Sequence, residues 1–338
     1  MAMQYQKIVI SRYGGPEVLE VVSEELREAQ PGEVRVRVLA AGVAWVEYML
    51  RHGTYPHQPK PPLTPGYDVV GVVDQNGAGA TRFKEGQMVA ALTCLGGYSQ
   101  YVYLPEAELV AVPAGLDPAA AVCLVLNYVT AYQMLHREVR VERGGRLLVH
   151  SAAGGVGTAA LDLGRLAGLE MLGTASPAKL QLVEKLGARA IDYQREDFVA
   201  RVSELARGGV DLVLDSIGGS HWLRSRRCLR RGGTLIAYGS QGSLAGGRRS
   251  VARTLEDYAV GALLMALPLG RRFAFYSITA MKARHPDWFQ EDLSKLFRLL
   301  AAGQIQPVIA QRLPWTEARR ANELLEQGAV QGKLVLVF

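Results

Sequence analysis

The chain has 338 residues and a formal net charge of +6 at pH 7, with 49% hydrophobic and 21% charged residues; these values suit a globular protein of two domains and exclude a disordered or fibrous one. Its three cysteines are widely spaced and form no C-x-x-C pair, which argues against a disulfide framework or a structural zinc site and favours a reducing, cytoplasmic location. Because the N-terminus carries no charged-then-apolar signal and no apolar run approaches the roughly 18 residues of a membrane span, we expect neither secretion nor a membrane anchor.

The first third of the chain alternates apolar and polar residues in the manner of β-strands, as at residues 33–38 and 69–73. Glycine and proline interrupt these segments, so an antiparallel β domain is predicted. From residue 146 the pattern changes to alternating strands and helices, which right-handed crossovers turn into a doubly wound parallel sheet, an α/β fold of the Rossmann type. The strands expected there are residues 146–152, 170–175, 190–193, 210–217, 233–239 and 272–278.

The tail of the chain predicts a helix, a strand, a second helix and a last strand, at residues 290–302, 307–313, 317–327 and 333–338. We expect these elements to fold back onto the β domain. We see no internal repeat or low-complexity stretch.

A glycine cluster follows the first of the later strands and precedes helix-forming sequence. Small residues at positions 152, 154 and 157 reproduce the spacing of the G-x-G-x-x-G fingerprint, with Ala152 in place of the first glycine. In this motif the glycines allow a tight turn, a close approach of the backbone to phosphate, and packing of the helix on the strand. The cluster therefore predicts a dinucleotide site.

The end of the second strand indicates which dinucleotide binds. An NAD site has an Asp or Glu roughly 20 residues after the glycines, which accepts hydrogen bonds from the ribose 2′-hydroxyl, but residues 173–179 contain no acid. Ser176 and Lys179 could instead hold a 2′-phosphate, so NADPH is favoured. Alternatively, Ser176 and Pro177 cap the next helix and Lys179 is solvated; both interpretations can hold, because a helix N-terminus also attracts phosphate.

Five loops should line one crevice, because in such a sheet the ligand lies beyond the carboxyl ends of the strands. These loops follow residues 152, 175, 193, 217 and 238, and most of them contain glycine, serine or proline. Several phosphate-compatible loops on one edge are more specific than a single glycine motif.

Two later segments allow more than one interpretation. Five arginines crowd residues 224–231, which could indicate a polyanionic partner. No aromatic-interleaved or zinc-finger pattern accompanies them, so we favour a solvated helix end and expect no nucleic-acid binding. Residues 258–269 form the most apolar segment and are interpreted as a buried helix or an oligomer contact.

With these residues placed, the chain resembles the zinc-independent quinone oxidoreductases of the medium-chain dehydrogenase/reductase superfamily, nearly from end to end. Residues 126–132, 238–249 and 303–307 are most similar to the subgroup related to the vesicle amine transport protein. The resemblance implies a GroES-like antiparallel β-barrel catalytic domain of residues 1–124 and 281–338 and a Rossmann NADPH-binding domain of residues 125–280. The matching stretches are the glycine turn and residues 40–43, 65–73, 96–102, 127–132, 173–176, 191–193, 214–219 and 332–333.

The resemblance also implies which residues hold the cofactor. Tyr193 could instead pack on the sheet, Thr130 could be a helix-start hydroxyl near no ligand, and Lys333 could be a solvated charge rather than a residue that closes over the nucleotide. The implied set is Thr130 near the nicotinamide, Ala153, Gly154, Gly155 and Val156 in the turn, Thr174, Ser176, Lys179 and Tyr193 around the adenosine phosphate, and Ser216, Tyr238, Gly239, Ser240 and Lys333.

The sequence departs from the zinc-dependent relatives and from the usual quinone reductases. Zinc-dependent relatives need a Cys with an acid three residues on and a His-Glu pair after a Pro-Gly turn, where this chain has Ala44 to Glu47 and Tyr67 with Asp68. We therefore expect no catalytic zinc and no other metal. Quinone reductases of this type usually carry Asn and Asp in place of Ala44 and Glu47, which puts the substrate in doubt.

Without a metal, hydride chemistry belongs to the cofactor, and the protein supplies orientation and a proton. The expected acceptor is a quinone or an α,β-unsaturated carbonyl, because both delocalise the incoming charge. The candidate proton donors are Tyr48, Tyr55 and Tyr67, whose unperturbed pKa near 10 keeps them protonated at neutral pH, or else water. Weaker candidates are Glu47, His52, His57 and Asp68.

Two alternatives to a quinone reductase stay open at this point. One is an enoyl-thioester reductase of polyketide or lipid assembly, which shares the scaffold and the glycine turn. The other is a non-catalytic NADPH-binding adaptor. By analogy with relatives we also expect a homodimer joined by edge strands of the nucleotide domain, near residues 273–278.

Overall fold

The computed structural model describes residues 3–56, 58–241, 244–245, 248–249, 251–266 and 270–338. The chain divides into two compact units, the first made of Met1–Asn127 and Gln290–Phe338 and the second of Tyr128–Phe289. The sequence placed these boundaries at 124/125 and 280/281. Parts of the 238–249 motif, the end of the apolar 258–269 segment and His57 fall outside the described residues.

The first unit is built on a mostly antiparallel sheet in which β6 pairs with β3 and the other strands follow the order β16-β17-β3-β4-β5-β7. The last strand pairs with β3 in an antiparallel manner, so the tail folds back onto the β domain as predicted; β16 and β17 are parallel to each other. The strands are β1 (Gln4–Ile10) and β2 (Leu19–Glu25), which form a separate hairpin, and β3 (Glu33–Val43), β4 (Asp68–Asn76), β5 (Met88–Leu92), β6 (Tyr101–Pro105), β7 (Val110–Ala111), β16 (Ile309–Pro314) and β17 (Lys333–Val337).

The alternation along β3 explains why this segment forms a strand with one face in the core. Val34, Val36 and Val38 are buried, whereas Arg35 and Arg37 between them are not. The buried valines join a core that β4, β5 and β17 complete. The helices of this unit are α1 (Trp45–Arg51), α2 (Pro118–Cys123), most of α10 (Pro286–Ala301), α11 (Ala318–Glu326) and the short turns η1 (Pro16–Val18), η2 (Glu106–Glu108) and η7 (Trp315–Glu317).

The second unit holds a six-stranded sheet of order β10-β9-β8-β11-β12-β15, in which every neighbouring pair is parallel. This is the doubly wound order 3-2-1-4-5-6 of a Rossmann fold, and it confirms the predicted α/β architecture. The strands are β8 (Arg146–Val149), β9 (Glu170–Ala175), β10 (Arg189–Asp192), β11 (Val210–Asp215), β12 (Leu229–Ala237) and β15 (Arg272–Phe275).

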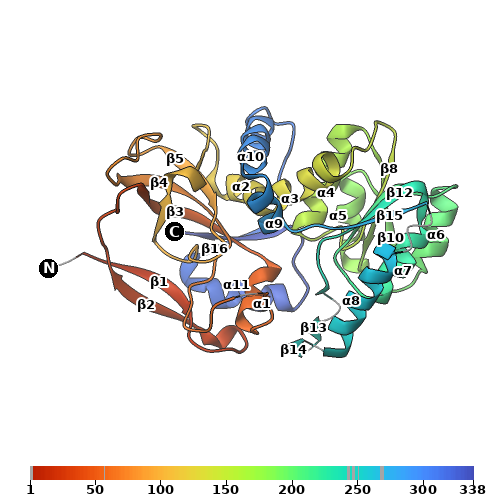
Figure 1. Cartoon of the computed structure of the whole chain (residues 1–338), viewed down its shortest axis with the longest axis horizontal. Coiled ribbons are helices and arrows are strands. Elements are labelled where there is room, and N and C mark those ends of the chain that lie inside the picture. The colour runs from red at the N-terminus through yellow and green to blue at the C-terminus, as the bar shows by residue number, and fades with distance from the viewer. Residues whose placement is uncertain (1–2, 57, 242–243, 246–247, 250, 267–269) are drawn as a thin grey trace. The chain divides into compact units, whose positions relative to one another are not determined.

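Helices cover both faces of this sheet (Figure 1). One core cluster gathers Phe198, Val202, Trp222 and Leu264 from α6, α7 and α8 against the strands. The helices are α3 (Val129–Gln133), α4 (Gly155–Ala167), α5 (Leu180–Lys185), α6 (Phe198–Leu205), α7 (Ser220–Arg227), α8 (Val251–Ala266) and α9 (Ile278–Arg284), with the turn η5 (Pro177–Lys179), the π-helical segments η3 (Leu124–Tyr128) and η4 (Met134–Glu138), and the short strands β13 (Leu244–Ala245) and β14 (Arg248–Arg249).

One helical stretch corrects an expectation from the sequence. The run Pro118–Glu138 is 21 residues long and apolar enough to cross a membrane by length and composition, although no apolar stretch of that length was expected. It passes from α2 through η3 and α3 to η4, so the boundary between the two units falls inside it. Because 89% of its most apolar window is buried, protein covers its apolar surface, as in a core helix.

Candidate functional site

The carboxyl ends of β8, β9, β10, β11 and β12 lie at one edge of the sheet, because these strands run parallel. In this fold the ligand binds at that edge, where the strand order reverses, here between β8 and β11. Ser151, Ser176, Tyr193, Ser216 and Gly239 all follow these strand ends. The structure therefore brings the loops singled out in the sequence to the same edge.

The turn between β8 and α4 has the construction of an anion-binding helix start. Ser151 adopts a left-handed backbone with a φ of 54°, and its carbonyl accepts a hydrogen bond from the Gly154 N–H at 2.9 Å. A Cβ at Gly157 would lie 2.3 Å from that carbonyl oxygen, so glycine is required for the helix to approach the turn. Gly155 and Val156 open α4, whose first turn contains no acidic residue. Their N–H groups have no partner within the helix, and together with its dipole they suit a pyrophosphate.

The alanine in place of the first fingerprint glycine is accommodated by the neighbouring strand. Ala152 lies outside the left-handed region, and its N–H donates to the Thr174 carbonyl at 3.1 Å. Gly173 is beside it on β9, where a Cβ would lie only 2.7 Å from the Ala152 Cβ. The alanine methyl therefore uses space that the glycine on β9 leaves open.

The residues expected around a 2′-phosphate follow β9 and β10. Ser176 has an extended backbone before η5, as a capping residue does, but its hydroxyl makes no capping hydrogen bond. Lys179 is half-buried, and this burial lowers the pKa of its ammonium group. Tyr193 keeps 54% of its surface exposed, so it is not packed into the core of the sheet. These positions are compatible with an adenosine phosphate, whose negative charge would raise the pKa of Lys179 and favour its charged form.

Thr174 and Ala153 differ from the others because their side chains are buried. The Thr174 hydroxyl lies 3.0 Å from Nδ1 of His150, in the interior of the unit. That Thr174 lies around the adenosine phosphate stays a prediction, and the contact with His150 leaves its backbone as the part that would face the nucleotide. Thr130 is also buried, in the second position of α3 rather than at the start of the long helix.

The loops after β11 and β12 are joined to the glycine turn. The Ser216 hydroxyl donates to the Ser151 hydroxyl at 3.2 Å, and the Tyr238 N–H donates to the carbonyl of the last residue of β11 at 3.0 Å. Burial raises the pKa of Tyr238 to about 12. Gly239 and Ser240 continue this loop, and a Cβ at Gly239 would lie 3.3 Å from the Ser216 carbonyl. Backbone and hydroxyl contacts thus hold the loops on both sides of the switch point in register.

Lys333, expected to close over the nucleotide, is fixed inside the first unit. Its ammonium lies 2.5 Å from Oδ2 of Asp68, and both side chains are at most 2% exposed. Gly42 on the adjacent strand leaves room for this pair, because a Cβ there would lie 2.1 Å from the Lys333 Cε. The alternative that Lys333 is a solvated charge is therefore wrong, since leaving the pair would strand a buried carboxylate. That Lys333 closes over the nucleotide stays a prediction.

Two of the three candidate proton donors lie together. The hydroxyl oxygens of Tyr55 and Tyr67 are 2.8 Å apart, and burial raises the pKa of Tyr67 above its ordinary value. A phenol with a raised pKa stays protonated at neutral pH and can donate its proton to a developing negative charge. Tyr48 belongs to another group, because its ring stacks on Trp45 at 4.4 Å.

Glu47, a weaker candidate donor in the sequence, organises the start of α1. One carboxylate oxygen accepts from the Ala44 N–H at 2.7 Å and the other from the Tyr67 N–H at 3.1 Å. Burial and the nearby charge of Asp68 raise the pKa of Glu47 to about 7. The carboxylate therefore connects the helix start to the segment that carries Tyr67.

The side chains at the zinc positions of the zinc-dependent relatives do not fit a catalytic zinc. Ala44, Glu47, Tyr67 and Asp68 include no cysteine or histidine, and zinc sites of this class are built from such ligands. Both carboxylates are already engaged, one with backbone N–H groups and the other with Lys333. No step of the chemistry is therefore assigned to zinc at this position.

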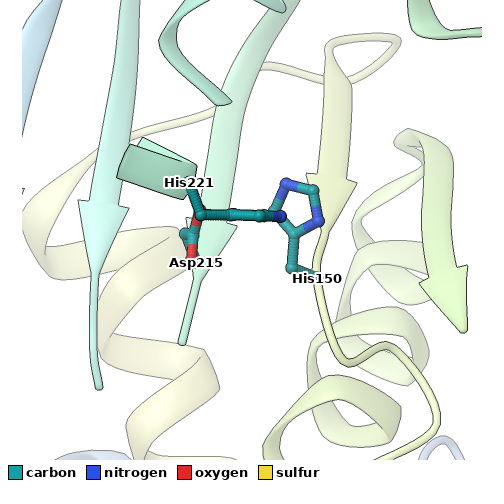
Figure 2. Close-up of side chains that lie close together, drawn as sticks. All are labelled: His150, Asp215 and His221. Atoms are coloured by element: carbon teal, nitrogen blue, oxygen red, sulfur yellow. The ribbon is translucent and has the colours of Figure 1, made fainter. Parts of the chain in front are cut away.

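Sequence reasoning missed a buried polar cluster under the nucleotide loops. His150, Asp215 and His221 lie side by side (Figure 2), and the Ser225 hydroxyl contacts all three. The four residues come from the ends of two strands and from α7, which are not adjacent in the sequence. Only the adjacency of His150 to the glycine turn could have drawn attention to them.

Comparison with known proteins gives the same architecture over the whole chain. Residues 30–114 match the family model described as "Alcohol dehydrogenase GroES-like domain" and residues 186–336 the model described as "Zinc-binding dehydrogenase". The chain is 34% identical over 337 residues to a quinone oxidoreductase of Pseudomonas aeruginosa, covering 98% of this chain and 99% of that protein.

Two further relatives extend the comparison. The synaptic vesicle membrane protein VAT-1 homolog of Danio rerio is 30% identical over 339 residues, which cover 98% of this chain and 70% of that protein. The crystal structure of Escherichia coli quinone oxidoreductase complexed with NADPH aligns with a TM-score of 0.87 and 29% identity, over 98% of this chain and 100% of that one.

Proposed function

Because the chain belongs to the quinone oxidoreductase and VAT-1 homologue family of the medium-chain dehydrogenase/reductase superfamily, we propose that it is an NADPH-dependent oxidoreductase that reduces a quinone or an α,β-unsaturated carbonyl without zinc. The observation that carries the proposal is the start of α4, where glycines precede N–H groups that have no partner within the helix and where the first turn has no acidic residue. Lys179, and no carboxylate, lies among residues 173–179 at and after the end of β9. The NADPH complex of the E. coli relative supports the same cofactor.

The residues present fit this cofactor. The first turn of α4, at Gly154, Gly155 and Val156, would hold the pyrophosphate by its N–H groups, and Ser176 and Lys179 would hold the 2′-phosphate. NADPH, when bound, supplies a hydride. The protein then has to bind the acceptor, exclude water and deliver one proton.

We assign the proton to the tyrosine pair of the first unit. Tyr67 is buried and protonated, and its hydrogen bond to Tyr55 gives it a neighbour through which the proton can be replaced. Quinones and enones delocalise the added charge over their own carbonyl, so a phenol can stabilise it where a Lewis acid is lacking. The Asp68–Lys333 pair and Glu47 stabilise the segments around the tyrosine pair, since all three side chains are held by contacts within the first unit.

The test is a screen of the purified protein for NADPH oxidation against a panel of quinones and enones, with a chelator present. Turnover with NADPH and little with NADH is expected, and Tyr67→Phe should lower kcat more than it lowers NADPH binding. Tight NADPH binding without turnover of any acceptor would favour the adaptor interpretation. Failure to bind NADPH would overturn the cofactor assignment.

The partner we propose is a second copy of this chain. β15 is the edge strand of the six-stranded sheet, and the described part of α8 beside it exposes large apolar side chains. An exposed apolar patch next to an unpaired strand edge is typical of a subunit contact. Sedimentation at working concentration should show a dimer that Tyr258→Lys disrupts; a monomeric parent protein would contradict this. The exposed residues are Leu255, Tyr258, Leu263, Met265 and Phe275.

A further inference from the structure

The buried cluster beneath the nucleotide loops has the composition and geometry of a transition-metal site. His150 and Asp215 are buried and His221 is partly exposed, and one potential ligand atom from each lies within 4.8 Å of the others. Figure 2 shows the three side chains close together. His150 follows β8, Asp215 ends β11 and His221 lies in α7. Two imidazoles and one carboxylate are ligands that zinc-class ions bind. We propose that His150, Asp215 and His221 bind one divalent ion of the zinc class.

The Ser225 hydroxyl lies beside all three proposed ligands. Its oxygen is 2.6 Å from Asp215 Oδ2, 3.0 Å from His150 Nε2 and 3.4 Å from His221 Nδ1. His221 Nδ1 and Asp215 Oδ2 are 2.7 Å apart. Ligand atoms around tetrahedral zinc are separated by about 3.3 Å, since each bond is about 2.0–2.2 Å. Each of the four distances given above therefore has to change by well under an ångström to reach this value. Ser225 or a water molecule can complete the coordination.

The surroundings of the cluster prepare it for a cation. Nδ1 of His150 lies 3.0 Å from the Thr174 hydroxyl, which orients the ring so that Nε2 faces the cluster. Such a second contact is the usual support of a ligating histidine. Asp215 is fully buried and is the one carboxylate of the cluster, so it would supply the negative charge that balances the ion.

The proposed site differs from a catalytic metal site. Facial triads of two histidines and a carboxylate keep positions open for substrate, whereas here the Ser225 oxygen lies at the fourth ligand position, within 3.4 Å of all three ligand atoms. Arg224, on the same helix as His221 and Ser225, is paired with Asp197 at 2.9 Å. His221 is 21% exposed and gives the ion a route in. An ion here would join the ends of β8 and β11, whose next residues, Ser151 and Ser216, belong to the nucleotide loops.

The test is metal binding by the full chain after chelation and dialysis, with Zn²⁺ by calorimetry and elemental analysis and with Co²⁺ by visible absorption. We expect one equivalent of Zn²⁺ and a Co²⁺ spectrum of a four-coordinate site, with affinity at least about tenfold lower in His221→Ala and in Asp215→Asn. His285→Ala, which removes a histidine of the same unit outside the cluster, is the matched control and should bind as the parent does.

Three outcomes would overturn the proposal. The parent protein could bind no more Zn²⁺ than a surface histidine binds nonspecifically. Both cluster variants could bind Zn²⁺ as tightly as the parent protein, or His285→Ala could lower the affinity as much as they do. Circular dichroism in chelator checks that the variants are folded. Because His221 is partly exposed, its removal is the milder of the two substitutions, and Asp215→Asn keeps the shape of the buried side chain.

Discussion

Lys179 offers the sharpest test of cofactor choice, because it is the half-buried cation that follows β9 where an NAD site would carry an acid. We expect Lys179→Gln to weaken NADPH and to leave NADH nearly unchanged, since only NADPH has the 2′-phosphate. Lys179→Glu should go further, because a carboxylate at that position repels the phosphate.

The magnitude follows from the kind of contact and from its burial. A hydrogen bond to a charged group contributes about 1.5–3 kcal/mol, which is about 10- to 150-fold in Kd at about 1.4 kcal/mol per factor of ten. The half-buried position limits screening by water and salt, so the upper part of this range is expected. Burial lowers the pKa of Lys179, so in the parent protein the preference for NADPH should shrink as alkaline pH removes the ammonium proton. Lys179→Gln should lack this pH dependence.

The assay is the Kd of NADPH and of NADH by fluorescence or calorimetry, at fixed salt, for the parent and both variants. Lys185→Gln is the control and should change neither Kd, because Lys185 is an exposed lysine at the far end of α5, the helix that Lys179 precedes. Equal losses for both cofactors, or no loss of NADPH affinity, would refute the role of Lys179. The start of α4 would then carry the whole phosphate recognition.

Three further predictions concern stability. Lys333→Met should cost about 3 kcal/mol in urea unfolding, because it leaves the Asp68 carboxylate buried without its partner; a second change, Asp68→Leu, should restore most of the loss, and a single-variant loss below about 1 kcal/mol would contradict the buried pair. Gly173→Ala should destabilise by about 1–3 kcal/mol because its Cβ would meet the Ala152 methyl, and Ala152→Gly should recover part of this, whereas additive losses would argue against the compensation. The pKa of His150 is about 4 in the folded protein and 6.5 in the unfolded one, so the unfolded state binds a proton that the folded state does not. The free energy of unfolding should therefore fall by about 3 kcal/mol as pH drops from 6.5 to 4. In chelator, His150→Gln should make the free energy of unfolding less dependent on pH, and an unchanged pH dependence would count against this role of His150.

The architecture was largely legible in the sequence because local patterns determine it. Alternating valines predicted β3, and the glycine cluster predicted the turn before α4. The parallel, doubly wound sheet followed from the alternation of strands and helices and the right hand of their crossovers, whereas the order of its strands came from the structure. What could not be read was the partner of each buried charge, because Lys333 and Asp68, 265 positions apart, meet only when the last strand pairs beside the third. The apolar run 118–138 is present in the sequence and was overlooked there; only its burial required the structure.

Thr174 shows how a family role and a physical role can occupy the same residue. The resemblance placed Thr174 around the adenosine phosphate, and in the structure its hydroxyl contacts His150, one residue before Ser151. Asp215 likewise directly precedes Ser216. The cluster therefore reaches the residues next to both nucleotide loops through His150 and Asp215, whose side chains are buried. A buried polar network is costly unless all its members are satisfied, and this one is placed where the geometry of the loops matters most. The cluster therefore belongs to the construction of the nucleotide edge, and a metal ion would tighten the same contacts that Ser225 makes now.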